Sequence, residues 1–287
     1  MGGSSPCQLP RREPSATTLA GGQTFLSEYN VGRNGSARCL LICKEGSLNM
    51  RTLGSDCESI FGFMASFPPR RDTLEVAVAS ILPQVDRLFI YLNGYDHVPG
   101  FLEHEKIVAV PAHDLEDLRD VGKLYCMPEA PQGFYLTLDD DIFYPANYSE
   151  NLVAAAERYG RRAIVGVHGV ILDQSDRRYF TRGRMVHCFW KELESDVPVN
   201  VVGTGTMCFH SSTISLKANG MPKGMLDIGV ALAARQAMVP MVVVAREESW
   251  LQPLKVTGGT LYGEFCNNDE EHARLLESQP DWSILSP

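Results

Sequence analysis

An apolar strand that runs directly into three carboxylates constrains this chain more than any other feature. Residues 134–138 (Phe-Tyr-Leu-Thr-Leu) are strand-favouring types, and Asp139, Asp140 and Asp141 follow at once. Pro145 ends the segment, because proline has no N–H to donate to a strand ladder. In an extended segment, side chains two apart leave on the same side, so Asp139 and Asp141 project together.

A divalent cation is the obvious reason to hold three mutually repelling carboxylates at the end of a strand. Carboxylate oxygens are hard ligands that suit Mg²⁺ or Mn²⁺, and these ions usually share their coordination shell with substrate phosphates. The alternative is a solvated acidic turn. The buried strand that feeds the triplet and the Tyr-Pro that follows it favour a metal–phosphate site.

Composition narrows the classes of partner and compartment. The 287 residues suit one large domain or two small ones, and the net charge of −9 argues against a nucleic-acid-binding protein. The eight cysteines form no paired Cys-x-x-Cys motifs, which argues against a zinc site, and scattered thiols suit a reducing, cytoplasmic compartment. The sequence shows neither a signal peptide nor an apolar run long enough for a transmembrane segment.

Three regions differ in organisation along the chain. Residues 1–23 are rich in Gly, Ser, Pro, Thr and Arg, which predicts a disordered tail. Residues 24–58 read as an irregular N-terminal extension without a functional assignment. The organised domain is expected over residues 59–287.

Strands and helices alternate in the first half of this domain. The pattern predicts strands at 60–65, 88–92, 107–110, 134–138 and 163–167 and helices at 73–82, 115–125 and 147–159. Such alternation indicates an α/β fold with a mostly parallel sheet, in which ligands bind beyond the carboxyl ends of the strands. Polar groups follow three of these strands: residues 66–71, Asn93, and the aspartate triplet.

The second half predicts a smaller, mixed region. Strands are expected at 185–190 and 199–202, and a hydroxyl-rich turn at 203–206 follows them. Leu226-Asp227 opens a helix that extends to about 238. A buried strand at 241–245 precedes Arg246 and Trp250.

These motifs, in this order, resemble those of GT-A-fold glycosyltransferases of the family 2 type found in bacterial surface-polysaccharide clusters. Asp139-Asp-Asp-Ile-Phe-Tyr-Pro145 resembles the family's Asp-x-Asp motif, and Ala65-Ser-Phe-Pro-Pro-Arg70 resembles its first nucleotide-binding loop. Asp120-Val-Gly-Lys123 is similar to a segment upstream of the metal motif. Gly203-Thr-Gly-Thr206 and the residues from Asp227 to Leu251 match the order of the acceptor half. The resemblance covers residues 60 to about 282.

The resemblance implies a GT-A-like fold and a metal-dependent, hexosyltransferase-like activity. The enzyme would move a sugar from a nucleotide-diphosphate sugar to an acceptor hydroxyl, expected on a glycan, with Mn²⁺ or Mg²⁺ as cofactor. It would work in the cytoplasm or at the inner face of the membrane, as a freestanding enzyme or together with other domains of a larger polysaccharide-synthesis protein.

The resemblance also assigns donor-side roles. Asp139 and Asp141 would hold the metal, and His272 would complete its shell. Asp140 would contact ribose or sugar hydroxyls, while Lys123 and Arg70 would contact phosphates. The full set of expected donor-binding residues is Ser66, Phe67, Pro68, Arg70, Asn93, Asp120, Lys123, Asp139 and Asp140.

On the acceptor side, Asp227 is the expected catalytic base. Its alternative role is that of a helix N-cap, a common position for aspartate. Gly205, Thr206, Arg246 and Trp250 are expected to shape the acceptor pocket, since an indole face can stack on a sugar ring, although a core tryptophan is an equally good interpretation.

Two other functions fit parts of the sequence. A nucleotidyltransferase can use a similar sheet, but that class favours a glycine-rich loop after the first strand, and residues 66–71 contain no glycine. A non-catalytic module that binds sugar nucleotides or polysaccharide would need neither Asp227 nor two metal carboxylates.

Overall fold

The computed structural model describes residues 58–173, 178–180, 184–256, 260–265, 270–279 and 281–287, together with four short strands nearer the N-terminus. The chain divides into two units, Met1–Asp56 and Cys57–Pro287. In the first unit β1 (Ala16–Thr18) pairs with β2 (Thr24–Leu26), and β3 (Glu28–Val31) pairs with β4 (Ala37–Leu40), both antiparallel. Apart from these strands, the disordered tail and irregular extension expected over residues 1–58 lie almost wholly outside the described residues.

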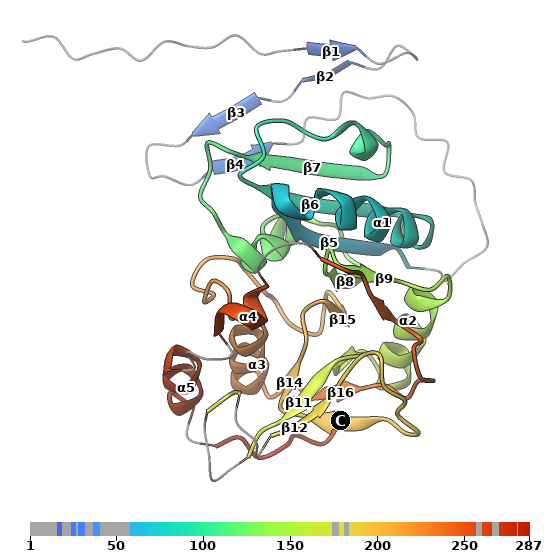
Figure 1. The fold of residues 1–287 in the computed structure, drawn as a ribbon, viewed down its shortest axis with the longest axis vertical. Coiled ribbons are helices and arrows are strands. Elements are labelled where there is room, and N and C mark those ends of the chain that lie inside the picture. Colours follow the sequence, from blue (N-terminus) through green and yellow to red (C-terminus); the bar gives the residue numbers. More distant parts are fainter. Residues whose placement is uncertain are drawn as a thin grey trace, which may run out of the picture. The chain divides into compact units, whose positions relative to one another are not determined.

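An eight-stranded sheet forms the centre of the second unit, in the order β13-β16-β10-β15-β8-β5-β6-β7 (Figure 1). The strands β5, β6, β7 and β8 pair in parallel, as do β10 and β16, while β15 and β13 run antiparallel to their neighbours. The α/β class with a mostly parallel sheet is thus confirmed. The strands are β5 (Ile60–Ser66), β6 (Arg87–Asn93), β7 (Ile107–Ala112), β8 (Phe134–Leu138), β10 (Ile164–Gly166), β13 (Val197–Val199), β15 (Thr206–His210) and β16 (Met241–Val243).

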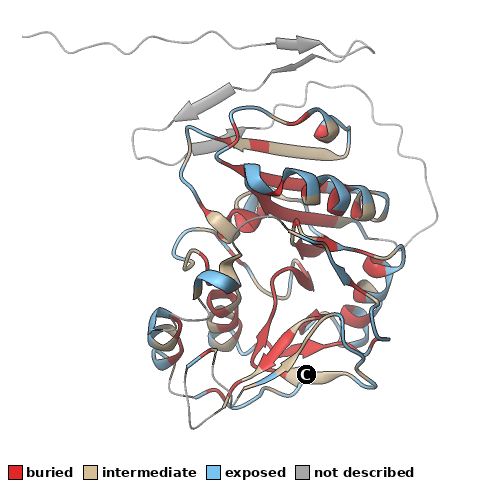
Figure 2. Ribbon diagram, viewed as in Figure 1, coloured by how far each residue is buried: buried red, intermediate tan, exposed pale blue. Residues whose placement is uncertain are grey.

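Alternating side chains give the sheet two buried faces, as the red strands of Figure 2 show. On β5, Phe61 and Phe63 join the core on one face, whereas Met64 joins the core on the other. Phe63 stacks on Phe89 of β6 with ring centroids 5.2 Å apart. The helices α1 (Arg71–Ile81) and α2 (Tyr148–Arg158) cover the Met64 face, and α3 (Leu226–Gln236) packs into the Phe61 face. Apolar burial on both faces is what a mostly parallel sheet requires.

Smaller elements surround this sheet. The second sheet has the order β12-β11-β14, and β9 pairs with β17. These strands are β9 (Ile142–Phe143), β11 (Gly169–Ile171), β12 (Met185–His187), β14 (Val201–Val202) and β17 (Gln252–Pro253). The remaining helices are α4 (Leu261–Phe265), α5 (Glu270–Glu277) and the short 3₁₀ segments η1 (Pro68–Arg70), η2 (Leu82–Gln84), η3 (Gly100–Leu102), η4 (Arg119–Leu124) and η5 (Met127–Glu129). Within the described parts of the chain, every helix is too short or too polar to cross a bilayer.

The helix expected over 115–125 is wrong in detail, because only the 3₁₀ segment η4 forms there. The side chain of Asn93 explains the difference. Its Oδ1 accepts the backbone N–H groups of Leu118 at 2.9 Å and Arg119 at 3.1 Å. Arg119, the first residue of η4, has a φ of 51°, which no right-handed α-helix contains, so the chain turns there.

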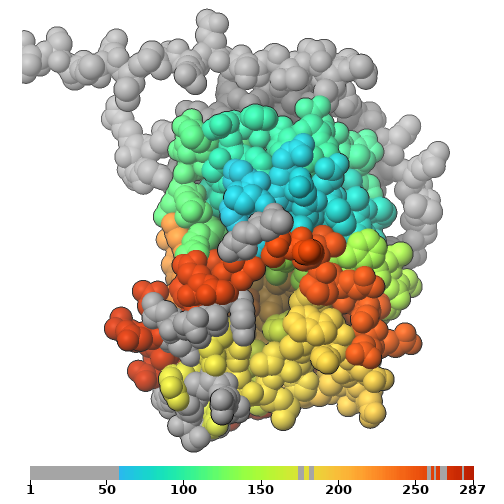
Figure 3. Space-filling model, viewed as in Figure 1, coloured from blue at the N-terminus to red at the C-terminus, as the bar shows by residue number. Residues whose placement is uncertain are grey.

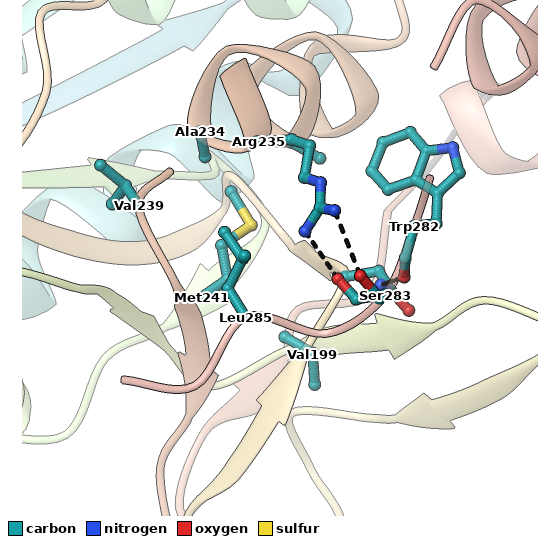
Figure 4. Close-up of a pocket in the computed structure, with 10 residues that line it drawn as sticks. Val199, Ala234, Arg235, Val239, Met241, Trp282, Ser283 and Leu285 are labelled. Carbon is teal, nitrogen blue, oxygen red and sulfur yellow. Dashed lines mark hydrogen bonds between the residues drawn. The ribbon is translucent and has the colours of Figure 1, made fainter. Parts of the chain in front are cut away.

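The C-terminal tail docks beside α3 (Figure 4). Arg235 of α3 donates to the carbonyl of Ser283 at 2.7 Å and pairs with Asp281. Asn200 donates to the carbonyl of Trp282 at 2.6 Å, and the indole of Trp282 donates to the carbonyl of Leu276 at 2.9 Å. These bonds lie beside a small pocket between α3 and the sheet edge formed by β13 and β16.

Candidate active site

The three carboxylates lie at the carboxyl end of β8, and Tyr144 fixes their position. The hydroxyl of Tyr144 accepts the backbone N–H of Asp139 at 2.8 Å and donates to the carbonyl of Gly205 at 2.8 Å. Tyr144 is fully buried and its ring lies 4.8 Å from that of Tyr148. One side chain thereby ties the aspartate turn to the hydroxyl-rich turn before β15.

The Asp139 carboxylate packs directly against Gly205. A Cβ added to Gly205 would lie only 1.9 Å from Asp139 Oδ2. Position 205 therefore excludes any side chain while Asp139 keeps its present place. This contact brings the residue expected on the acceptor side against the carboxylate expected to hold the metal.

A chain of polar contacts leads from Asp139 to Asp227. Lys123, which is almost fully buried, pairs with Asp139 and lies 3.5 Å from Thr204 Oγ1. The N–H and hydroxyl of Thr204 both donate to Asp227 Oδ1, at 2.8 and 2.6 Å. Burial alone would lower the pKa of Lys123, but the Asp139 carboxylate raises it, so the side chain stays charged. The structure thus joins the expected donor and acceptor sides in one site.

Asp120 holds the start of α3 and so places Asp227. Its two carboxylate oxygens accept the backbone N–H groups of Gly224 at 2.6 Å and Leu226 at 3.0 Å. The N-cap residue of α3 is Met225, without a side-chain cap bond, and Asp227 lies in the first turn. The alternative role of Asp227 as the N-cap is therefore wrong, since Asp120 from a separate element supplies the oxygens.

The first loop contributes a second cation to the site. Arg70, 6% exposed, donates to Asp141 Oδ2 at 2.9 Å, and its guanidinium lies 5.8 Å from the ring centroid of Phe67. Pro68 begins η1, which presents Arg70 at the end of β5. Ser66 is buried at the same strand end, and Phe67 is 40% exposed.

Asn93 has a positioning role in this structure. Besides accepting the N–H groups of Leu118 and Arg119, its amide donates to the carbonyls of Arg119 at 3.0 Å and of Ser66 at 3.4 Å. These bonds orient η4, which carries Asp120 and Lys123. Asn93 therefore links three of the segments expected to bind the donor.

Negative charge at the site exceeds what its two cations neutralise. Burial raises the pKa of Asp140 to about 7, and the charges of Asp141 and Asp139 add to the rise. Burial and Asp139 also raise the pKa of Asp141, although Arg70 and Lys123 oppose that rise. An additional cation would relieve this repulsion.

The donor set fits Mg²⁺ or Mn²⁺. Within the described residues no group of three or more His, Cys, Asp or Glu side chains is placed to hold an ion unaided. Such ions need fewer protein ligands than that, because they keep several waters and take oxygens from substrate phosphates. Asp139 and Asp141 offer hard oxygen atoms at an electrostatically unbalanced position, which is the chemistry these ions require.

His272 lies on α5 in an aromatic environment. Its ring packs against Tyr179, Phe180 and Phe265, with centroids 5.5, 5.1 and 5.0 Å away. The side chain is buried. The expected role of His272 as a metal ligand stays a prediction.

The other acceptor-side residues make structural contacts. Thr206 Oγ1 accepts the backbone N–H of His168 at 3.0 Å. Arg246 is buried and donates to the carbonyls of Val244 at 3.1 Å and Cys188 at 2.7 Å, and burial lowers its pKa to about 10. The indole of Trp250 donates to Asn147 Oδ1 at 3.0 Å, at the start of α2.

Sequence reasoning missed three residues of the site. Thr204 holds Asp227, Tyr144 joins the two turns, and His168 lies beside Gly203, whose N–H donates to the His168 carbonyl at 2.9 Å. Thr204 and Tyr144 lie inside the motifs at 203–206 and 139–145, and their hydroxyl groups are the signal in the sequence. His168 follows a short strand without any motif of its own.

A hollow opens in the middle of one face of the molecule (Figure 3). The orange C-terminal segment borders it on one side, and yellow residues preceding β13 border it on the other. The C-terminal segment is tied to the aspartate turn, because β17 pairs with β9 and Leu254 donates to the carbonyl of Asp141 at 2.7 Å.

No protein-family model matches the chain, and no curated protein matches its sequence significantly.

Proposed function

We propose that this protein transfers a sugar from a nucleotide-diphosphate donor to a hydroxyl acceptor, with the help of Mg²⁺ or Mn²⁺. The observation that carries the proposal is the continuous polar path from the aspartate turn to Asp227. It unites Asp139, Lys123, Thr204 and Asp227 at the carboxyl ends of the central strands. Ligands of open α/β sheets bind at such ends.

The donor's diphosphate belongs beside Asp139 and Asp141, which would hold the metal ion. When bound, the ion supplies a Lewis acid that neutralises the charge growing on the leaving diphosphate. Arg70 and Lys123 add positive charge, and both are nearly buried, so their attraction for phosphate is weakly screened. Each is now paired with one carboxylate of the triplet, so phosphate and ion would exchange partners with these pairs.

Asp227 is the base for an inverting transfer. Thr204 occupies Oδ1, and no described residue donates to Oδ2, which leaves that oxygen for the acceptor. The acceptor oxygen forms the new bond to the anomeric carbon and gives its proton to Asp227. The bond from that carbon to the phosphate oxygen breaks, and its electron pair leaves with the nucleoside diphosphate.

The test is product release from a set of nucleotide-sugars, with Mn²⁺ and with EDTA. Wild type should release nucleoside diphosphate only with the metal, and Asp141→Asn should lower the rate by about 100-fold or more while its thermal melt stays cooperative. Asp114→Asn, which changes an exposed carboxylate elsewhere, is the control and should keep the wild-type rate.

Three outcomes would refute the proposal. Full activity of Asp141→Asn would remove the metal role of the triplet. Release of pyrophosphate would indicate nucleotidyl transfer. Binding of nucleotide-sugars without release of either product would indicate a non-catalytic module.

A further inference from the structure

An exposed tryptophan stands near the acceptor end of the site without a role in the core. Trp190 follows β12 and is 39% exposed. Its ring lies 4.9 Å from that of Phe189 at an interplanar angle of 86°, and Phe189 lies 6.1 Å from the ring of His168. The three rings form a series that leads from the surface to His168.

The backbone around Trp190 is held rigidly. Its carbonyl accepts the N–H of Ser249 at 2.9 Å. Leu193 and Arg246 exchange two backbone hydrogen bonds at 2.9 and 2.8 Å, and the Arg246 guanidinium donates to the carbonyl of Cys188 at 2.7 Å. The turn that presents the indole is thereby fixed to the chain after β16, so its exposure does not reflect a loose loop.

His168 connects this aromatic series to the proposed reaction site. Its N–H donates to Thr206 Oγ1, and its carbonyl accepts from Gly203. Both ends of the turn at 203–206 therefore hold His168, and Thr204 of the same turn donates to Asp227. Nδ1 lies below the surface, and no described residue is placed to hydrogen-bond with it. An ordered water commonly satisfies a nitrogen in such a position. The other ring nitrogen, Nε2, is not among the buried atoms and has no hydrogen-bond partner in the described residues, so it is the nitrogen that a ligand hydroxyl can reach.

The charges around His168 are mixed. Burial lowers the pKa of the His168 imidazole, and the positive charges of Arg246 and Arg184 lower it further. The negative charges of Asp227 and Asp139 oppose this shift. A neutral imidazole has one N–H donor and one acceptor nitrogen. It can therefore pair with a sugar hydroxyl, which also donates and accepts.

We propose that Trp190, Phe189 and His168 form a subsite for a carbohydrate acceptor. The apolar face of a pyranose ring would stack on the indole of Trp190, and a hydroxyl of the same or the next sugar would bond to His168 beside Asp227. An indole gives a sugar a large, rigid contact surface, and the imidazole gives direction. The inference rests on the proposed function, since it names the acceptor class of that site.

Binding is tested first, without any need for turnover. Saturation-transfer NMR with the methyl β-glycosides of glucose, galactose, N-acetylglucosamine and glucuronic acid should show ring-proton contacts for at least one glycoside. Trp190→Ala should weaken its binding by about tenfold, which corresponds to the loss of one stacked ring. Trp190→Tyr should retain most of the binding. Ile284→Ala, which removes an apolar side chain that is 40% exposed on the C-terminal tail, should change nothing.

Transfer to the same glycoside then separates this subsite from the donor site. Trp190→Ala should raise the acceptor KM by about tenfold and leave metal-dependent donor hydrolysis unchanged. His168→Ala should also raise the acceptor KM, and His168→Gln should restore part of that loss. The subsite is refuted if none of the glycosides binds wild type, or if binding survives Trp190→Ala. A fall in donor hydrolysis in Trp190→Ala that matches the loss of glycoside binding would also overturn the proposed subsite. Absence of donor hydrolysis in a wild type that binds glycosides would instead refute the proposed function alone.

Discussion

Two adjacent buried tyrosines should differ in how much stability the protein loses when each is replaced by phenylalanine. Tyr144 uses its hydroxyl twice, toward Asp139 and Gly205, whereas the hydroxyl of Tyr148 has no partner among the described residues. Both rings are almost completely buried, and their centroids lie 4.8 Å apart. Replacing each with phenylalanine therefore removes one oxygen from nearly the same environment.

The magnitudes follow from the partners left behind. Tyr144→Phe leaves the Asp139 N–H and the Gly205 carbonyl without their bonds, and each unsatisfied buried group costs about 1–3 kcal/mol. We expect the free energy of unfolding to fall by about 2–6 kcal/mol. Tyr148→Phe removes a desolvated, unpaired hydroxyl, so the free energy of unfolding should stay unchanged or rise by about 1 kcal/mol.

Urea unfolding measures both variants, provided that the m value stays constant. Tyr144→Phe should also slow donor hydrolysis, because Asp139 loses the group that orients its backbone. Equal changes in stability for the two variants would contradict this reasoning, since they would show that the hydroxyl of Tyr144 does not join the two turns.

Other variants test separate parts of the site. Burial raises the pKa of Asp140 to about 7, so the stability that protonated Asp140 contributes is complete below its unfolded pKa and is lost as the pH rises through about 7. Without metal, Asp140→Asn should remove this loss. Its free energy of unfolding relative to that of wild type, measured in urea, should rise by about 2 kcal/mol between about pH 5.5 and about pH 8. A difference that does not change with pH would refute this prediction. Gly205→Ala should displace the Asp139 carboxylate and lower donor hydrolysis by more than about tenfold, at a stability cost of about 1–3 kcal/mol by thermal melting. Asp120→Asn should destabilise by about 1–2 kcal/mol through the lost cap of α3, and an unchanged melting temperature would contradict that role.

The sheet could be predicted because its central strands correspond to short apolar runs in the sequence. A run as short and apolar as 60–65 or 134–138 is most readily buried as a central strand. The strands β5 and β8 confirm both predictions. The carboxyl-end rule then placed Arg70 and the aspartates together, and the Arg70–Asp141 pair agrees with that placement. Local pattern and topology were sufficient here.

The links between distant segments could not be read from the sequence. Asp120 caps α3 across about a hundred residues of chain, and Asn93 interrupts the expected helix at Arg119 through its side chain. Such contacts depend on how the elements pack, and the hydrophobic periodicity of the sequence predicts the elements but not their packing. His168 was missed for the same reason, since its place beside Gly203 arises only when β11 and β14 pair.

The central claim is that the aspartate turn binds a divalent ion that in turn holds a diphosphate. Thermal-shift measurements with UDP and GDP, each with Mn²⁺ or with EDTA, test it directly by mass action. Mn²⁺ and one diphosphate together should raise the melting temperature by more than the sum of their separate effects, and Asp141→Asn should abolish that excess. Equal stabilisation by the diphosphate in EDTA, or an excess that persists in Asp141→Asn, would contradict the claim.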